Sequence, residues 1–183
     1  YRRNPEELSK IDDALRDVMG NSDVIIQGIY IEGYASPEGT YASNARLSKA
    51  RAEALREYIV SKFPLNSSLF KVSNVAEDWD GLVELVNASD MAQKEQVLKI
   101  IETIGIFDGR ESALMRLNGG VPYLLMLKEM FPELRRVEYQ VDYTVKDYDL
   151  PKTLVVLQKN PADLSQLELY NLAFSSEKWG GEF

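Results

Sequence analysis

The sequence predicts an α+β fold in which helices cover one face of a sheet and a further helical lobe is attached. Residues 24–34 are dense in β-branched and aromatic side chains, and residues 137–145 alternate apolar with polar side chains, so both segments are expected to be strands. Apolar residues recur at spacings of three and four in residues 5–19 and again in residues 77–132, which predicts helices.

Composition excludes several classes of function. The 183 residues include 45% hydrophobic residues, enough for a core, and carry a formal net charge of −8, which argues against nucleic acid as a partner. There is no cysteine and no histidine, so disulfides, thiolate or imidazole metal sites and a Ser-His-Asp triad are excluded. No apolar run approaches the roughly 20 residues of a membrane-spanning helix. We therefore expect no metal, no cofactor and no membrane-spanning segment.

The first two elements follow directly from local patterns. Pro5–Met19 reads as a helix with one apolar stripe, capped by Asn4 and ended by Gly20. Val24–Tyr34 reads as a strand. Because it is dense in β-branched and aromatic residues, it is expected to be buried on both faces and central in its sheet.

A glycine-bounded turn, Gly33–Gly39, follows this strand and contains a proline. Thr40 is then placed to cap a second helix, Tyr41–Lys62, which stops before a Phe-Pro pair. Phe70–Val75 is expected to be a second, short strand.

The rest of the chain divides into an insertion, a strand and a tail. Residues 77–132 are expected to form a lobe of helical pieces interrupted by glycines, and Val137–Val145 is the clearest strand, with one dry and one wet face. In the tail, residues 147–183, Asp163–Phe174 looks helical. A lone helical pair cannot bury its own apolar face, so the tail is expected to lead into a missing helical region.

One charged residue stands out on the second helix. Helical spacing places Arg51 within an apolar stripe made by Leu47, Ala54 and Tyr58. A buried guanidinium needs a partner or an opening to water. One reading is structural: Arg51 reaches the surface or pairs with Glu32 or Glu38. The other reading is functional: Arg51 and Asn44 line a cleft for an anion or zwitterion beside the glycine turn.

An acidic run follows the second strand and includes Glu77, Asp78, Asp80 and Glu84. A pair of these carboxylates would be needed if the chain hydrolysed glycans. Nothing in their spacing favours catalysis, and we interpret the run as a solvated acidic loop.

Residues 33–52 resemble the signature of the OmpA C-terminal domain family. The matching positions fall in register without a gap: Gly33, Gly39, Asn44, Leu47, Ser48, Arg51 and Ala52. The closing strand, which begins Arg135-Arg136-Val137-Glu138, is also similar to that of the family. The resemblance implies a βαβαβ-type mixed sheet with helices on one face, spanning residues 1–146 and carrying the insertion. The family has a further strand before its first helix, for which Tyr1–Asn4 is too short.

In that family a turn aspartate and a helix arginine clamp the diaminopimelate of the peptidoglycan stem peptide. The resemblance therefore implies a non-catalytic, periplasmic module that is associated with the outer membrane and cell wall of a Gram-negative bacterium. The residues it implicates in ligand binding are Tyr34, Ala35, Ser36, Glu38, Asn44, Leu47 and Arg51. Ser36 stands where the family has its aspartate, so Glu38 is the candidate to supply the missing charge.

Two other functions stay open. The departure at Ser36 favours a protein-interaction module of an outer-membrane or fimbria-type surface assembly, in which the peptidoglycan site is degenerate. A glycan hydrolase that uses carboxylates alone is the third hypothesis, and a muropeptide-release assay would test it.

Overall fold

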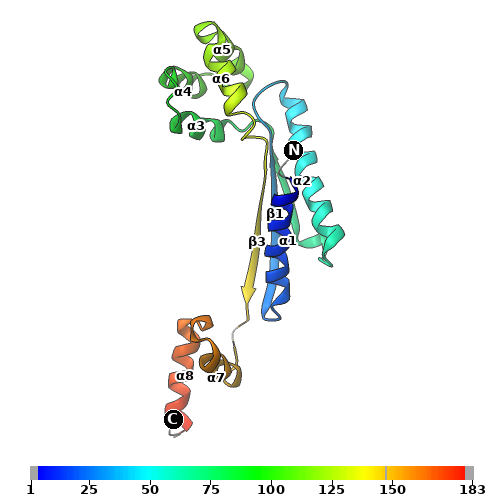
Figure 1. The fold of residues 1–183 in the computed structure, drawn as a ribbon, viewed down its shortest axis with the longest axis vertical. Helices are drawn as coiled ribbons and strands as arrows, with labels where there is room; N and C mark the ends of the chain where they lie inside the picture. Colours follow the sequence, from blue (N-terminus) through cyan, green and yellow to red (C-terminus); the bar gives the residue numbers. More distant parts are fainter. Residues whose placement is uncertain (1–3, 147, 180–183) are drawn as a thin grey trace. The chain divides into compact units, whose positions relative to one another are not determined.

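The computed structural model describes residues 4–146 and 148–179, and the expectations that concern residues 1–3 and 180–183 lie outside this range. Within it, the predicted helices and strands of residues 5–145 appear in the predicted order with a few shifted ends, and the tail holds a helix at Leu150–Lys159 that the sequence analysis did not assign (Figure 1). The elements are α1 (Asn4–Gly20), β1 (Val24–Tyr34), α2 (Tyr41–Lys62), η1 (Ser67–Leu69), β2 (Phe70–Val75), α3 (Trp79–Ala88), α4 (Lys94–Thr103), η2 (Ile106–Asp108), α5 (Arg110–Arg116), η3 (Leu117–Gly120), α6 (Val121–Glu129), β3 (Val137–Val145), α7 (Leu150–Lys159), η4 (Pro161–Asp163) and α8 (Gln166–Trp179).

The described strands form one three-stranded mixed sheet in the order β2-β1-β3. β1 and β2 run parallel, with Ile29 opposite Phe70 and Tyr34 opposite Val75. β1 is therefore central and β3 is its neighbour, as predicted.

β3 runs antiparallel to β1. The amide of Tyr34 donates to the carbonyl of Arg136 at one end, and the amide of Lys146 donates to the carbonyl of Asp23 at the other. The two faces of β3 are less distinct than predicted, because Tyr143 on its apolar face is 51% exposed. β3 lies at an edge of the sheet, where its side chains have a strand neighbour on one side.

α2 covers one face of the sheet. On β1, Ile29, Ile31 and Gly33 alternate inward and are buried. Tyr30 and Glu32 point to the opposite face, where Tyr30 is 37% exposed. The expectation that β1 is buried on both faces was therefore wrong: the second face carries long polar and aromatic side chains that reach water and line a shallow groove.

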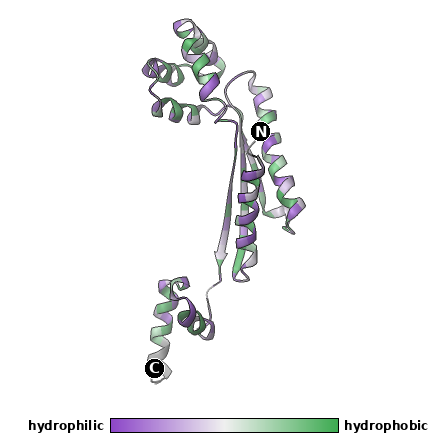
Figure 2. Cartoon of the chain, viewed as in Figure 1, coloured by the Kyte–Doolittle hydropathy of each residue, from purple (hydrophilic) through white to green (hydrophobic). Residues whose placement is uncertain are grey.

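The insertion is mostly helical, as predicted, and has a core of its own within the described residues. α3, α4, α5 and α6 pack around a cluster of apolar side chains, with Phe131 and Met126 fully buried at its centre. Figure 2 shows hydrophobic and hydrophilic residues alternating along these helices, which is the pattern of helices that bury one face. We call α3 to α6 the lobe.

Asp78 joins the lobe to the sheet. Its amide donates to the carbonyl of Ala35 at 2.9 Å, and its carboxylate caps α3 by accepting from the amide of Gly81 at 2.9 Å. The other carboxylate oxygen pairs with Arg136 at the start of β3. The side chain is only 4% exposed, so the expectation of a fully solvated acidic loop was wrong at this residue. A buried carboxylate there satisfies a helix end and a guanidinium at once.

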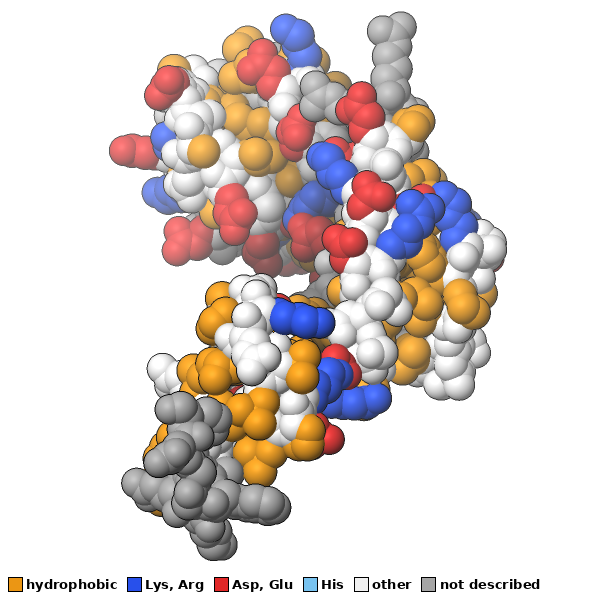
Figure 3. All heavy atoms as spheres, turned by 60° about the horizontal axis from the view of Figure 1, so that its bottom comes forward, with side chains coloured by type: hydrophobic (Ala, Val, Ile, Leu, Met, Phe, Trp, Pro, Cys, Tyr) orange, Lys and Arg blue, Asp and Glu red, His pale blue; other side chains and the backbone are white. Residues whose placement is uncertain are grey.

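The chain divides into two compact units, residues 27–142 and a second made from residues 1–26 and 143–183. In the second unit, α1 buries Ile11 and Leu15, and α7 and α8 form a helical pair. Several side chains of this pair stay exposed, and Figure 3 shows hydrophobic atoms on its surface. The most exposed are Leu150, Val155, Leu167, Tyr170 and Phe174. The expected uncovered apolar face is thus present in the described residues.

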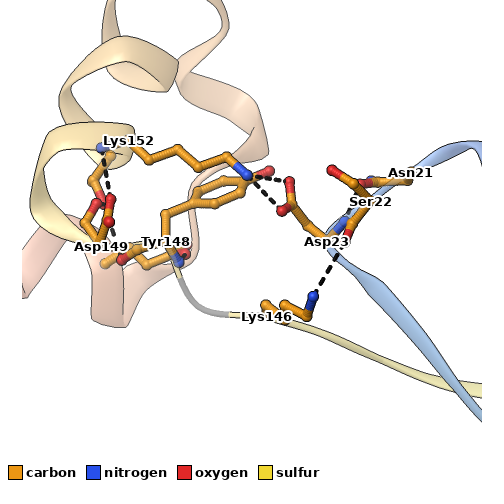
Figure 4. A network of polar contacts seen from close by, with 9 residues as sticks. Asn21, Ser22, Asp23, Lys146, Tyr148, Asp149 and Lys152 are labelled. Carbon is orange, nitrogen blue, oxygen red and sulfur yellow. Dashed lines mark hydrogen bonds and ion pairs between the residues drawn. The ribbon is translucent and has the colours of Figure 1, made fainter.

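Polar contacts hold the start of this helical pair (Figure 4). Lys152 on α7 pairs with Asp23, and the Lys146 ammonium donates to the carbonyl of Ser22. Glu168 on α8 accepts from the amides of Tyr148 and Ser165, both at 2.8 Å. These backbone hydrogen bonds lower the pKa of Glu168.

None of the helices that the structure describes has both the length and the apolar character needed to cross a membrane.

Candidate functional site

The close approach of α2 to the end of β1 sets the geometry of the candidate site. A Cβ atom at Gly33 would lie 2.0 Å from the carbonyl oxygen of Ser48, so only glycine allows the helix backbone to rest there. Thr40 caps the helix, since its side chain accepts from the amide of Ser43. The turn of residues 35–39 is thus held between a fixed strand end and a fixed helix start.

The buried face of α2 differs from the predicted one. Leu47 is 49% exposed and Ala54 is exposed, so the predicted Leu47–Ala54–Tyr58 stripe does not face the sheet. The buried residues are Asn44, Ser48, Ala52, Leu55 and Ile59. The prediction followed the larger apolar side chains, whereas close packing on Gly33 selects small ones. Ser48 is tolerated there because its hydroxyl donates to the carbonyl of Asn44 at 2.8 Å.

Arg51 lies beside this buried face and is partly buried. Its Nη1 donates to the carbonyl oxygen of Tyr34 at 2.9 Å, where β1 ends and the turn begins. The two carboxylates predicted as partners of Arg51 have other partners. Glu32 accepts from the hydroxyls of Tyr34 and Ser73, and Glu38 pairs with Arg135. A guanidinium has five N–H donors, so the contact with Tyr34 leaves donors for a ligand carboxylate.

Arg135 was not among the predicted site residues, yet it connects two of them. Its Nε donates to the hydroxyl of Ser36 at 3.0 Å, and its Nη2 pairs with one carboxylate oxygen of Glu38. Ser36 is only 4% exposed. One guanidinium therefore brings the carboxylate of Glu38 beside the hydroxyl at position 36. The Arg135-Arg136 pair before the closing strand could have indicated this role. The sequence analysis used the pair only to identify the strand.

The second carboxylate oxygen of Glu38 has no comparable contact. Oε2 is buried and has no hydrogen-bond partner among the described residues. A buried carboxylate oxygen without a donor is costly, and its lone pairs can accept from a cation. The turn thus holds a carboxylate that pairs through one oxygen with the Arg135 guanidinium and keeps the other oxygen without a hydrogen-bond partner among the described residues.

Asn44 fastens the turn to α2. It is 5% exposed, and its Nδ2 donates to the backbone carbonyl of Glu38 at 3.0 Å. Its side chain also hydrogen-bonds to Glu77 at the edge of the lobe. Burial raises the pKa of Glu77, and the hydrogen bonds from Trp79 and Asn44 partly offset that effect. Asn44 is therefore a link between the turn and the lobe.

Three of the predicted site residues, Tyr34, Ala35 and Leu47, do not direct a side chain into the candidate site. The Tyr34 ring lies on the opposite face of β1 from Gly33, where its hydroxyl donates to Glu32 and Arg136 stacks 4.1 Å from its centroid. Burial and the neighbouring Glu32 raise the pKa of this phenol. The Ala35 amide and carbonyl are used by β2 and Asp78. Tyr34 and Ala35 therefore shape the site through their backbone groups. Leu47 is exposed on α2 and borders the site.

We define the candidate site as Ser36, Glu38, Asn44, Arg51 and Arg135. The structure brings the first three together with Arg135 and places Arg51 on the carbonyl that begins the same turn. The arrangement offers cationic donors for a carboxylate and an anionic acceptor for an ammonium group. Groups of these two signs have the chemistry to bind a zwitterion.

Comparison with known proteins gives one match. The model of the OmpA family matches residues 3–97, just over half of the chain, which takes in β1, the turn, α2 and β2 but stops before β3. No curated protein and no solved structure matches the sequence.

Proposed function

The chain belongs to the OmpA family, and from that premise we propose that it binds the diaminopimelate-containing stem peptide of peptidoglycan in the periplasm, without catalysis. OmpA family domains are binding modules of the cell envelope, and the chemistry of the candidate site fits that role. We further propose residues 1–146, with the insertion at 77–132, as the OmpA-like domain and residues 147–183 as a C-terminal extension.

The observation that carries the proposal is the contact of Arg135 with both Ser36 and Glu38. Family members use an aspartate at position 36 to balance the ammonium group of diaminopimelate. Here Glu38 brings a carboxylate next to that position, and its Oε2 has no hydrogen-bond partner among the described residues. In our proposal Glu38 accepts from the ligand ammonium, while Arg51 donates to the ligand carboxylate.

Arg51→Ala tests the carboxylate half of the site. We expect binding of a diaminopimelate-containing peptide, measured by calorimetry, to weaken about tenfold or more, because a charged hydrogen bond is typically worth about 1.5–3 kcal/mol. Retention on purified sacculi should fall in parallel, and free diaminopimelate should compete for it. The protein should stay folded, since the Arg51 contact is with one carbonyl at the edge of the buried face.

Arg46→Ala is the matched control, because Arg46 lies exposed on the same helix and the charge change is the same. It should bind like the wild type. If Arg46→Ala and Arg51→Ala lose affinity equally, the effect comes from net charge and the role of Arg51 is excluded.

Exchanging the acidic group between positions 36 and 38 tests the ammonium half. Glu38→Gln should weaken peptide binding about tenfold, since it removes one charged hydrogen bond. Adding Ser36→Asp to that variant should restore most of the affinity, because the new carboxylate stands beside the same Arg135 guanidinium. Ser36→Asp alone should change affinity little.

A loss in Glu38→Gln that Ser36→Asp fails to rescue would mean that Glu38 only holds Arg135 in place. Equal, undetectable binding by the wild type and every variant would favour the alternative function, a protein-interaction module of a surface assembly. The observation that favours this alternative is the set of exposed apolar side chains on the lobe, among them Met115, Val121 and Leu124.

A further inference from the structure

Two exposed aromatic rings meet beside the candidate site. Tyr41 is the first residue of α2 and is 44% exposed, and Phe107 belongs to η2 of the lobe and is 78% exposed. Their ring centroids lie 5.1 Å apart, with the planes inclined by 63°. A phenylalanine this exposed makes little use of its apolar surface in folding. We call Tyr41 and Phe107 the aromatic pair.

The aromatic pair is continuous with the candidate site. Tyr41 and Asn44 stand three positions apart on α2, so their side chains are neighbours on the helix surface. Asn44 in turn hydrogen-bonds to the turn carbonyl of Glu38 and to the side chain of Glu77. The rings therefore lie about one helical turn from the side chain that fastens the turn.

Within the lobe, side-chain contacts anchor the segment that carries Phe107. The Trp79 indole donates to Glu77 at 2.9 Å, and the Arg110 guanidinium lies 4.8 Å from the centroid of the Trp79 ring. Arg110 also donates to the carbonyl of Ile104 at 2.7 Å, just ahead of the segment that carries Phe107. Phe107 is thus presented by an anchored segment, which lowers the entropy lost when a ligand packs on it.

We propose that the aromatic pair packs against a sugar ring of the glycan strand that carries the stem peptide. This inference rests on the proposed function, because the sugar is covalently attached to the peptide and has to lie close to the peptide site. The C–H face of a pyranose is apolar and packs against aromatic rings, while its hydroxyls remain in water. Peptide and sugar would then be recognised together, the first by the family site and the second with a residue of the lobe.

The size of the aromatic pair favours a sugar over a protein partner. From the area of an aromatic side chain, the exposed parts of both rings together amount to about 250 Å². A stable protein interface needs about 800 Å² on each partner. One or two sugar rings match the smaller area.

The experiment compares two ligands in calorimetry: the free diaminopimelate-containing stem peptide, and the same peptide attached to its disaccharide. Wild type should bind the disaccharide-peptide more tightly. Phe107→Ala should weaken binding of the disaccharide-peptide about fivefold, the effect of one aromatic contact, and leave the free peptide unchanged. Phe107→Tyr should retain wild-type affinity for both ligands because it keeps the ring. Leu124→Ala, which removes a side chain 61% exposed on α6 of the same lobe, is the control and should change neither affinity.

Failure of this inference is distinct from failure of the proposed function. If the free peptide binds in an Arg51-dependent manner but the disaccharide adds no affinity, the aromatic pair does not bind sugar and the peptide site stands. An equal loss on both ligands in Phe107→Ala also overturns the inference, since the ring would then only shape the peptide site. Binding of neither ligand overturns both proposals.

Discussion

Gly33→Ala is expected to lower the free energy of unfolding by about 3 kcal/mol, at the upper end for an overpacked core position. The new Cβ would lie 2.0 Å from the Ser48 carbonyl oxygen and 3.1 Å from the Ala52 Cβ. The first neighbour is helix backbone, so the clash cannot be relieved by a side-chain rotation and α2 has to move. Urea denaturation followed by circular dichroism measures the loss.

The same substitution should also weaken binding of the stem peptide. Arg51 reaches the Tyr34 carbonyl, and Asn44 reaches the Glu38 carbonyl, only while α2 lies close to the strand end. Gly20→Ala is the matched control, because a Cβ there meets nothing within 4 Å. It should change neither stability nor affinity appreciably. A Gly33→Ala protein as stable as Gly20→Ala would show that the helix does not rest on the strand as described.

Asp78→Ala is expected to destabilise the protein by about 2–4 kcal/mol, the combined effect of a lost helix cap and a lost buried ion pair. The carboxylate caps α3 through Gly81 and pairs with Arg136. Burial alone would lower the pKa of Arg136, but its hydrogen bonds to Asp78 and Glu138 raise it, which is the sign of a stabilised charged form. Urea denaturation at neutral pH measures the change.

Two neighbouring variants separate the contributions of Asp78. Asp78→Asn keeps an acceptor for the Gly81 amide and removes the charge, so its loss should fall between those of the wild type and Asp78→Ala. Asp80→Ala makes the same charge change at an exposed position in the first turn of α3. It should cost less than about 1 kcal/mol, the usual effect of one charge on a helix dipole. Equal losses in Asp78→Ala and Asp80→Ala would contradict the buried role of Asp78.

The sequence predicted the elements better than it predicted their faces. The bounds of β1, β2, β3 and α2 were confirmed because each has a strong local pattern with a clear start or stop signal. The buried face of α2 was wrong because periodicity weighs large apolar residues such as Leu47, whereas the contact with Gly33 requires small ones such as Ser48.

The candidate site was predictable only as far as its residues are close in sequence. Spacing and resemblance identified Ser36, Glu38, Asn44 and Arg51, which lie within one strand-turn-helix segment. The contact of Arg135 with Ser36 joins residues 99 positions apart, and no local pattern encodes such a pair. The buried role of Asp78 was hidden for the same reason, because its partner Arg136 lies 58 positions further on.

That 58-residue separation also bears on the order in which the chain folds. The entropy lost on closing a loop grows with the logarithm of its length, so β3 gains its place beside β1 at a high cost if the intervening residues are unstructured. The lobe is built from short-range helical contacts, which form fast, and its two ends are joined by the Asp78–Arg136 pair. If the lobe folds first, the effective loop between β2 and β3 becomes shorter and β3 starts close to the sheet. A folded lobe therefore lowers the entropy cost of pairing β3 with β1, and with it the cost of positioning Arg135, which lies just before that strand.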